Sequence, residues 1–176
     1  MPTPAYVTVP NPATGDVVAA AHIDDLATNV SYLKDRVDNP PRTRLSHSTT
    51  QSLADATPTA VAFDTEATDS AALHDNATNN SRITVPTGEA GTWEFEASLE
   101  FAANATGQRQ ISFRFDGANT IGFVSVQSTS SGVTRLNVTV KVALTVGQYA
   151  EVIASQNSGG ALNLAADRYF SGQRVA

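Results

Sequence analysis

From Arg42 to the C-terminus, apolar and polar side chains alternate with a period of two, and no helical period interrupts them. The alternation predicts about nine strands, at residues 45–48, 59–63, 82–85, 92–102, 109–115, 120–127, 133–144, 148–156 and 169–175. Turn-forming residues separate them at 86–88, 104–107, 116–117, 130–132, 146–147 and 158–160. The pattern therefore favours an all-β sandwich or barrel over an α/β fold.

The clearest alternation is in residues 91–101, GTWEFEASLEF. Its apolar side chains and those of the later strands are expected to face one core: Trp93, Phe95, Leu99, Phe101, Ile111, Phe113, Phe115, Leu136, Val138, Val140, Val142 and Leu144. Burial of each large side chain contributes roughly 1.5 to 3 kcal/mol. We therefore expect an inward-facing Phe→Asp change to unfold the domain.

The polar side of the same stretch carries Glu94, Glu96 and Glu100. Residues two apart on one strand face are about 6.6 Å apart, which lies inside the roughly 5 to 9.5 Å range of carboxyl pairs in glycoside hydrolases. Any alternating strand with acids on its polar side gives the same spacing. Catalysis also needs a cleft and one acid buried among apolar groups, and the sequence indicates neither. Pairing with arginines and a plain solvated face remain alternatives, and we expect no enzyme.

Other catalytic and metal-binding patterns are weak. The sequence has no G-x-S-x-G elbow and no phosphate-binding glycine loop. The acidic stretch 63–75 contains possible calcium ligands, namely Asp64, Glu66, Asp69, His74 and Asp75, but their spacing matches no EF-hand. The three histidines, His22, His47 and His74, are too scattered to indicate zinc. We expect a solvated acidic loop, with no metal and no cofactor.

Composition narrows the classes of partner. The 11 basic residues against 17 acidic ones, with a pI near 4.9, argue against a nucleic-acid ligand. The absence of cysteine excludes disulfides and thiolate metal sites. No run of eighteen apolar residues occurs, and the first residues lack the pattern of a signal peptide, so we expect a soluble chain and no membrane partner.

The N-terminal part differs from the rest. Prolines at positions 2, 4, 10 and 12 predict an extended arm over residues 1–16. Residues 17–41 are predicted to form a helix to about Val37 and then an Asn39-Pro40-Pro41 linker, ahead of one domain at 42–176. The helix carries a stripe with coiled-coil spacing: Ile23, Leu26, Val30, Leu33 and Val37.

This stripe needs a partner, either its own domain or another copy. The proline break before the strands favours self-association. Two heptads are too few to hold a coiled coil alone, and β-branched residues at a with Leu at d lean towards two strands. The helix does not by itself indicate a trimer.

Several stretches resemble the C1q/TNF-like jelly-roll domains of tailed-bacteriophage structural proteins: TRLSHSTTQSLADATPTAVAF, HDNATNNSRITVPTGEAGTWEFEASLEFAANATG, VGQYAEVIASQNSGGALNL and YFSGQRVA. The resemblance covers residues 42–176. The segment GDVVAAAHIDDLATNVSYLKDRVDNPP resembles the arm and helix that often precede such domains in phages of actinobacteria.

The resemblance implies a sandwich that assembles as a tight trimer, with one sheet of each subunit lining the threefold axis. Aromatic residues often gather on that axis, and the candidates in this chain are Tyr149, Tyr169 and Phe170. Arg174 stands where a bulky apolar residue is common.

In such a fold the strand 92–102 lies beside the C-terminal strand and close to the first one. Arg42, Arg44 and Arg174 lie on those neighbours, so we expect them to pair with the glutamates across strands or between subunits. The predicted interface residues are Ile23, Leu26, Val30, Leu33, Val37, Arg44, Glu94, Glu96, Glu100, Tyr169 and Arg174.

The function that the resemblance implies is a trimeric capsid decoration or minor capsid protein. It would be made in the host cytoplasm and would bind the major capsid protein on the outer surface of the virion. The alternative is a tail-appendage domain that presents the loops DNATNNS (75–81) and SQNSGG (155–160) to a host-cell glycan. Glycan binding requires exposed aromatic residues, and the predicted burial of Trp93 counts against it.

Overall fold

The computed structural model describes residues 20–128 and 132–175, so the predicted arm at 1–16 lies outside the described residues. The chain divides into two compact units, the first ending at Pro40 and the second beginning at Pro41. The described elements are α1 (Ala20–Asp38), β1 (Arg42–Ser46), β2 (Gln51–Leu53), β3 (Thr59–Ala60), β4 (Thr65–Asp69), β5 (Arg82–Thr84), β6 (Gly91–Phe101), β7 (Gln108–Phe115), β8 (Asn119–Gln127), β9 (Thr134–Leu144), β10 (Tyr149–Gln156), β11 (Leu162–Leu164) and β12 (Tyr169–Arg174).

Helix α1 ends where the sequence predicts. The backbone N–H of Asn39 donates to the Asp35 carbonyl at 2.7 Å, and Pro40 and Pro41 cannot continue the hydrogen-bond ladder. The five residues of the predicted stripe are 55 to 79% exposed. Among the described residues, the stripe of α1 is therefore an exposed apolar surface.

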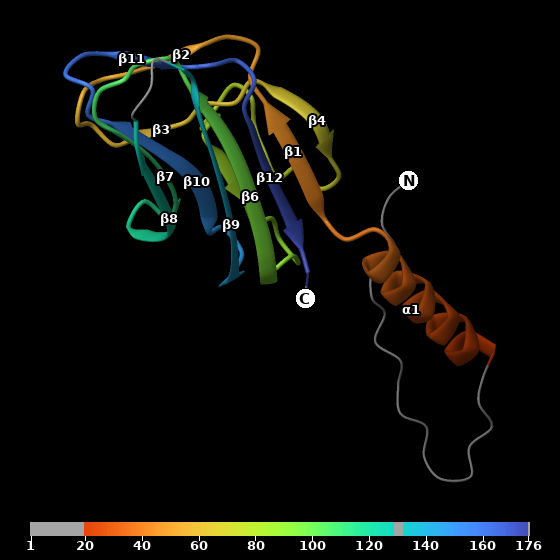
Figure 1. Ribbon diagram of the computed structural model, residues 1–176. Coiled ribbons are helices and arrows are strands. Elements are labelled where there is room, and N and C mark those ends of the chain that lie inside the picture. The colour runs from red at the N-terminus through yellow and green to blue at the C-terminus, as the bar shows by residue number, and fades with distance from the viewer. Residues whose placement is uncertain (1–19, 129–131, 176) are drawn as a thin grey trace. The chain divides into compact units, whose positions relative to one another are not determined.

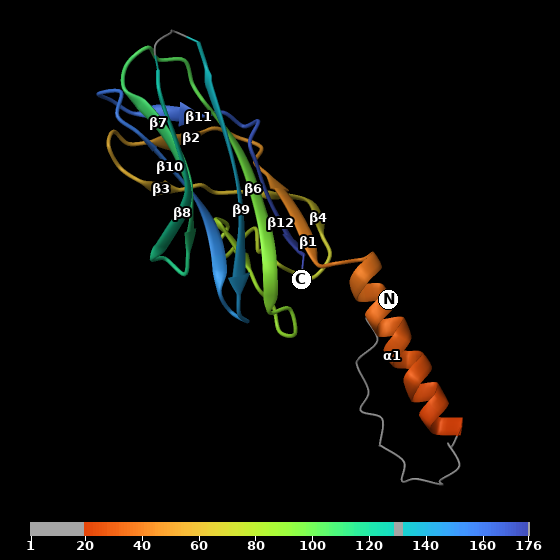
Figure 2. The same ribbon diagram turned by 60° about the horizontal axis from the view of Figure 1, so that its bottom comes forward.

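The second unit is a two-layer sandwich of antiparallel strands (Figures 1 and 2). Sheet A has the order β2-β11-β6-β12-β1-β4, with β9 on the other side of β6, and sheet B has the order β3-β10-β7-β8, with β5 beside β10. Strand β6 is central in sheet A because β12 pairs with one of its edges and β9 with the other. The predicted all-β sandwich is confirmed.

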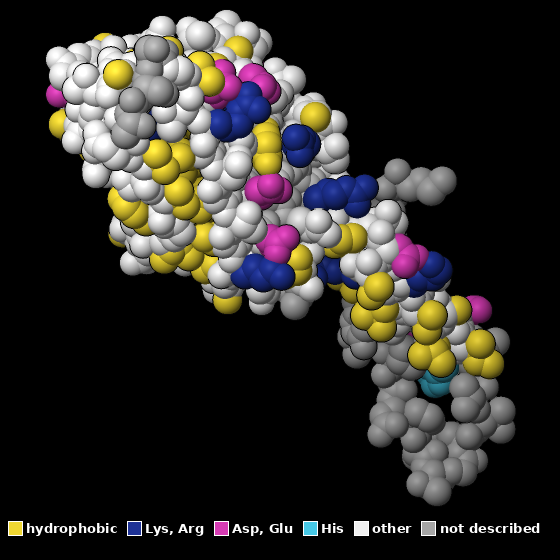
Figure 3. Space-filling view, in the orientation of Figure 1, with side chains coloured by type: hydrophobic (Ala, Val, Ile, Leu, Met, Phe, Trp, Pro, Cys, Tyr) yellow, Lys and Arg dark blue, Asp and Glu magenta, His cyan; other side chains and the backbone are white. Residues whose placement is uncertain are grey.

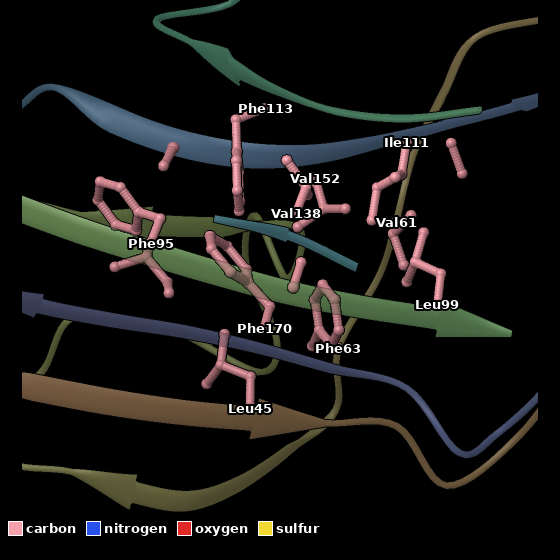
Figure 4. Packing of buried hydrophobic residues seen from close by; sticks show 14 of the residues in the cluster. Leu45, Val61, Phe63, Phe95, Leu99, Ile111, Phe113, Val138, Val152 and Phe170 are labelled. Carbon is pink, nitrogen blue, oxygen red and sulfur yellow. The ribbon is translucent and has the colours of Figure 1, made fainter. Parts of the chain in front are cut away.

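The core lies between the sheets, where side chains from both layers point toward one another (Figure 4). Its centre is aromatic: the ring of Phe95 lies 5.8 to 6.1 Å from those of Trp93, Phe113 and Phe115 and 6.0 Å from that of Phe170. Phe170 was expected on a subunit axis. It is fully buried in this core instead, because it occupies an inward position of β12.

All nine predicted strands are present, with boundaries that differ by a few residues. The stretch 59–63 forms a ladder only at Thr59–Ala60, although Val61 and Phe63 are fully buried beyond it. Three short strands, β2, β4 and β11, were not predicted. Strand β4 has the sequence TEATD and pairs only with β1, so it lacks the apolar face by which strands are found.

Strand β8 contains a bulge at Gly122. The β7–β8 register shifts between Ile111 and Phe113, so that Gly122 and Phe123 together oppose Ser112. Gly122 has φ +67°, and a Cβ there would overlap Cγ1 of Val140 and lie 3.0 Å from Cγ2 of Val138. Only glycine therefore lets β8 approach β9 this closely.

Candidate functional site

The outer face of sheet A carries most of the predicted interface residues of the domain. On it, Glu94 lies opposite Lys141 of β9, and Glu100 lies opposite Arg135 of the same strand. The Lys141 ammonium is 2.9 Å from the Glu94 carboxylate, and Arg135 Nη2 lies 2.5 Å from Glu100 and 3.2 Å from Asp167. Two of the three glutamates are thus paired within one chain.

The cations in these pairs are not the ones that the sequence analysis named. Arg135 and Lys141 were missed because the register of β9 against β6 was unknown. The spacing did hold a signal, since Arg135 and Lys141 are six residues apart, as are Glu94 and Glu100. In an antiparallel pair, equal spacings on one face can align end to end.

The third glutamate takes part in a mixed contact with β12 and β1. The Tyr169 hydroxyl donates a hydrogen bond of 2.6 Å to Glu96, and the Arg44 guanidinium lies 4.3 Å from the centre of the Tyr169 ring. The hydrogen bond to Glu96, together with partial burial and the charge of that carboxylate, raises the pKa of Tyr169, while Arg44 opposes the shift. The structure therefore brings Arg44, Glu96 and Tyr169 together.

Arg174 does not join this face. It pairs in register with Trp93, on the side of β12 that alternates inward, and its Nε donates to the Ala90 carbonyl at 3.2 Å. The expected cross-strand pairing of Arg174 with a glutamate does not occur within one chain, because the strand parity places Gln173, rather than Arg174, beside Glu94.

A groove of about 270 Å³ crosses the same face, with Arg42 and Arg44 on one side and Glu94 and Glu96 on the other. Ser171 and Gln173 of β12 lie between the two pairs. None of the three glutamates is enclosed by apolar side chains: Glu96 is exposed, and the other two are ion-paired. The face does not supply the environment that a glycosidase acid needs.

A second surface lies along β8 and β9, the edge strands of sheets B and A. Their inward-facing side chains are only partly covered: Ile121 is 39% and Val126 43% exposed, and Val140 and Val142 are partly buried. Figure 3 shows hydrophobic side chains gathered over these strands, beside the mixed charges of sheet A. We call this surface, formed by Ile121, Val126, Val140 and Val142, the apolar edge.

Two carboxylates of the acidic stretch are hydrogen-bonded to nearby backbone N–H groups. Asp69 accepts hydrogen bonds from the backbone N–H groups of Leu73 and His74, each at 3.0 Å, and Asp75 accepts from Ala77 and Thr78 at 2.8 and 3.0 Å. These bonds order a turn. Within residues 20–128 and 132–175, no group of three or more possible ligands lies together.

The outer face of sheet B holds an ion cluster that the sequence analysis missed. The carboxylate of Glu151 is 2.8 Å from Arg114 and 3.2 Å from Arg82, and it accepts a bond of 2.9 Å from Ser81. Burial raises the pKa of Glu151, but the hydrogen bonds from Arg114, Ser81 and Arg82 outweigh it and lower the pKa below its usual value. The cluster joins β5, β7 and β10.

Tyr149 belongs to this face too, with the Arg82 guanidinium 3.9 Å from its ring centre. It therefore lies on sheet B and Tyr169 on sheet A, so the predicted aromatic axis cluster is not one group. The two Asn-rich loops are likewise separate: Asp75, Thr78 and Asn79 line one cavity, and residues 155–157 line another.

Two further arginines are buried without lying on either face. Arg168 donates to the carbonyls of Thr49 and Ala165 at 2.9 and 2.7 Å, and burial lowers its pKa to about 10. Arg109 donates to the carbonyls of Asn104 and Thr106, each at 2.9 Å. Both guanidiniums tie loops to the sandwich.

No helix in the described part of the chain is long and apolar enough to cross a membrane.

Comparison with known proteins gives a fold but no close relative. No family model matches the chain, and no curated protein matches it. Among solved structures, the globular domain of zebrafish complement 1qA has a TM-score of 0.53 at 13% identity, covering 77% of this chain and 98% of that one. Murine APRIL at pH 5.0 has a TM-score of 0.58 at 11% identity, covering 78% and 100%. Murine APRIL at pH 8.0 has a TM-score of 0.55 at 14% identity, covering 77% and 98%. The second unit of the chain is thus a jelly roll of the C1q/TNF type.

Proposed function

We propose that the protein is a homotrimeric structural component of a bacteriophage particle, a decoration or minor capsid protein that binds and stabilises the capsid exterior. The resemblance of the stretches quoted above to phage jelly-roll proteins supports the phage assignment. The observation that carries the assembly is the apolar edge, which is only partly covered within one chain.

A second copy is the occupant that best fits the apolar edge. The edge is an opening of the core itself, where Val140 and Val142 pack on buried residues while still reaching solvent. In this assembly the apolar edge of one copy would contact the outer face of sheet A of the next copy, which is a different surface of the subunit. A contact between two different surfaces is heterologous, and it closes into a ring when the rotation allows. A ring of three would bring the sheet A faces around one axis.

The stripe of α1 supports the same assembly. Three residues, 39–41, join the end of α1 at Asp38 to the start of β1 at Arg42, so the helix of each copy is tied by a short linker to the sheet that would line the axis. In a trimer, three helices on such short linkers can pack their stripes together. The jelly-roll contact would supply the stability that two heptads lack.

The resemblance to phage jelly-roll proteins supports binding to the capsid. A small trimer at the junctions between capsid subunits buries surface across them and so stabilises the shell. Such a role needs binding energy rather than turnover. The partner would be the major capsid protein, and the location the outer surface of the virion.

Light scattering of the purified chain tests the assembly. We expect a mass of three times 18.4 kDa at micromolar concentration. Ile121→Glu should shift the mass to that of one chain, because a charge would be buried in the contact. Val146→Glu is the matched control, since Val146 is a 48% exposed valine in the turn after β9. A wild-type monomer, or a trimer that survives Ile121→Glu, would contradict the proposal.

Copy number per particle tests the position on the virion. Quantitative mass spectrometry of purified particles should give hundreds of copies for a capsid protein, whereas a handful would place it on the tail. Particles that lack the protein should lose heat stability and keep normal adsorption to host cells. Loss of adsorption with unchanged stability would contradict the decoration role.

A further inference from the structure

The outer face of sheet B has a cavity of about 280 Å³ at the end of the sheet where β7 begins and β10 ends. The residues that line it share one property, the absence of charge: Ala56, Pro58, Gln108, Gln110, Ser155, Gln156 and Asn157. Its volume is just below the roughly 300 to 1,000 Å³ that is typical of small-molecule sites.

The cavity is a fixed structure. Gln156 is 1% exposed, donates to the carbonyls of Leu53 and Gly160 at 3.2 and 2.8 Å, and accepts from the Ser158 N–H at 2.8 Å. The Asn157 side-chain oxygen accepts from the Gln108 N–H at 2.5 Å. These bonds hold the rim before any ligand arrives, which reduces the entropy lost on binding.

Several polar groups of the cavity are still available. Gln110 lies opposite Ser155 in the β7–β10 ladder. Within the part of the chain that the structure describes, the Ser155 hydroxyl and the Asn157 side-chain NH₂ donate to no protein group. Gln108 and Gln110 share one long contact of 3.4 Å. Amides and hydroxyls both donate and accept hydrogen bonds, so the cavity can bind a ligand rich in hydroxyl groups.

An exposed aromatic ring lies on the same face. Phe123 is 61% exposed, and the bulge at Gly122 places it opposite Ser112, the next outward residue after Gln110 on β7. Ser125, two residues after Phe123, lies opposite Gln110. Same-face diagonal neighbours are about 7 to 8 Å apart, so the ring lies near Gln110 on this face, beyond the residues that line the cavity.

We propose that this face binds a neutral carbohydrate, with the sugar hydroxyls on Gln108, Gln110, Ser155 and Asn157 and an apolar sugar face on the Phe123 ring. A neutral sugar has both kinds of surface. A phosphate or an acidic ligand would need a cation in the cavity, and its lining contains none. The site lies within one subunit and on the sheet opposite the polar face of sheet A, so it does not depend on the proposed trimer.

The experiment uses the full-length chain on a glycan microarray that carries neutral and acidic glycans, followed by affinity electrophoresis through gels containing dextran, galactomannan, arabinogalactan or alginate. We expect at least one neutral glycan to bind. Phe123→Ala and Gln110→Ala should each weaken that binding about fivefold or more. Thr120→Ala, at the far end of the same face of β8 and opposite Arg114, should leave it unchanged.

Circular dichroism and the thermal midpoint of each variant establish that it is folded, and light scattering reports the trimer separately. Three outcomes would overturn the proposal. They are binding to no neutral glycan, binding only to alginate or other acidic glycans, and neutral-glycan binding that neither Phe123→Ala nor Gln110→Ala weakens.

Discussion

Replacing Gly122 by alanine should destabilise the jelly roll by more than the same change at a turn glycine with free space around it, such as Gly147. A left-handed conformation costs an alanine roughly 1 to 2 kcal/mol, offset by about 0.4 to 1 kcal/mol from the less flexible unfolded chain. At φ +67° the added methyl would also overlap Val140, and such overpacking costs about 1 to 3 kcal/mol. The expected total is roughly 1 to 4.6 kcal/mol.

Urea unfolding followed by tryptophan fluorescence measures this loss, because Trp93 is fully buried in the same core. Gly147→Ala is the matched control: its φ is +83°, and a Cβ there meets no atom within 4 Å. It should cost only the backbone part, about 1 kcal/mol. Equal losses for the two variants would refute the close approach of β8 and β9.

A double-mutant cycle makes the test sharper. Val140→Ala removes the methyl groups that the new Cβ would overlap, so it should recover part of the loss in the Gly122→Ala background. The coupling energy between the two changes should be about 0.5 kcal/mol or more. A coupling near zero would mean that the Gly122→Ala cost comes from the backbone alone.

Three further predictions follow from the packing and the charges. Phe95→Ala should lower the free energy of unfolding by about 3 to 5 kcal/mol, measured by urea titration, because four other rings surround it. Glu151→Gln should lower the free energy of unfolding by roughly 1.5 to 3 kcal/mol at pH 7. Because the pKa of Glu151 is lowered in the folded state, its carboxylate stabilises the fold above the ordinary pKa of 4.5, and this stabilisation is lost as pH falls through the lower folded value. In thermal scans from pH 7 to 3, the melting temperatures of Glu151→Gln and the wild type should therefore converge. Combined Leu26→Ser and Leu33→Ser should weaken the trimer by light scattering yet leave unfolding of the jelly roll within about 0.5 kcal/mol, because both side chains are exposed.

The sequence predicted the sandwich because its long strands bury one face. Every apolar position of β6 is buried, and the alternation in 91–101 is enough to find it. The same rule failed for β4, where no side chain is buried and the strand is held by backbone pairing with β1 and by a hydrogen bond from the Thr43 hydroxyl to the Thr68 carbonyl. A strand without buried side chains cannot be predicted from the alternation of apolar residues.

The site was harder to predict because it depends on register. Alternation placed Glu94, Glu96 and Glu100 on one face, which is correct, but only the pairing of β6 with β9 decides that Lys141 and Arg135 are their neighbours. Arg174 was assigned to the wrong face of its strand, because an error of one residue in the alternation moves a side chain to the other face. Glu151 and Arg114 are 37 residues apart, and no local pattern connects them.

The bulge in β8 links the two surfaces that we assign to assembly and to ligand binding. Strict alternation from Val124 and Val126 would send Ile121 and Phe123 to the same outer face. The extra residue at Gly122 reverses the parity, so Ile121 lies opposite Phe113 on the inner side while Phe123 stays outward, opposite Ser112. The bulge at Gly122 therefore places Ile121 in the apolar edge and Phe123 on the outer face of sheet B. The sequence NTIGFVSVQ carries the signal, since its apolar residues change from odd to even positions beside an isolated glycine.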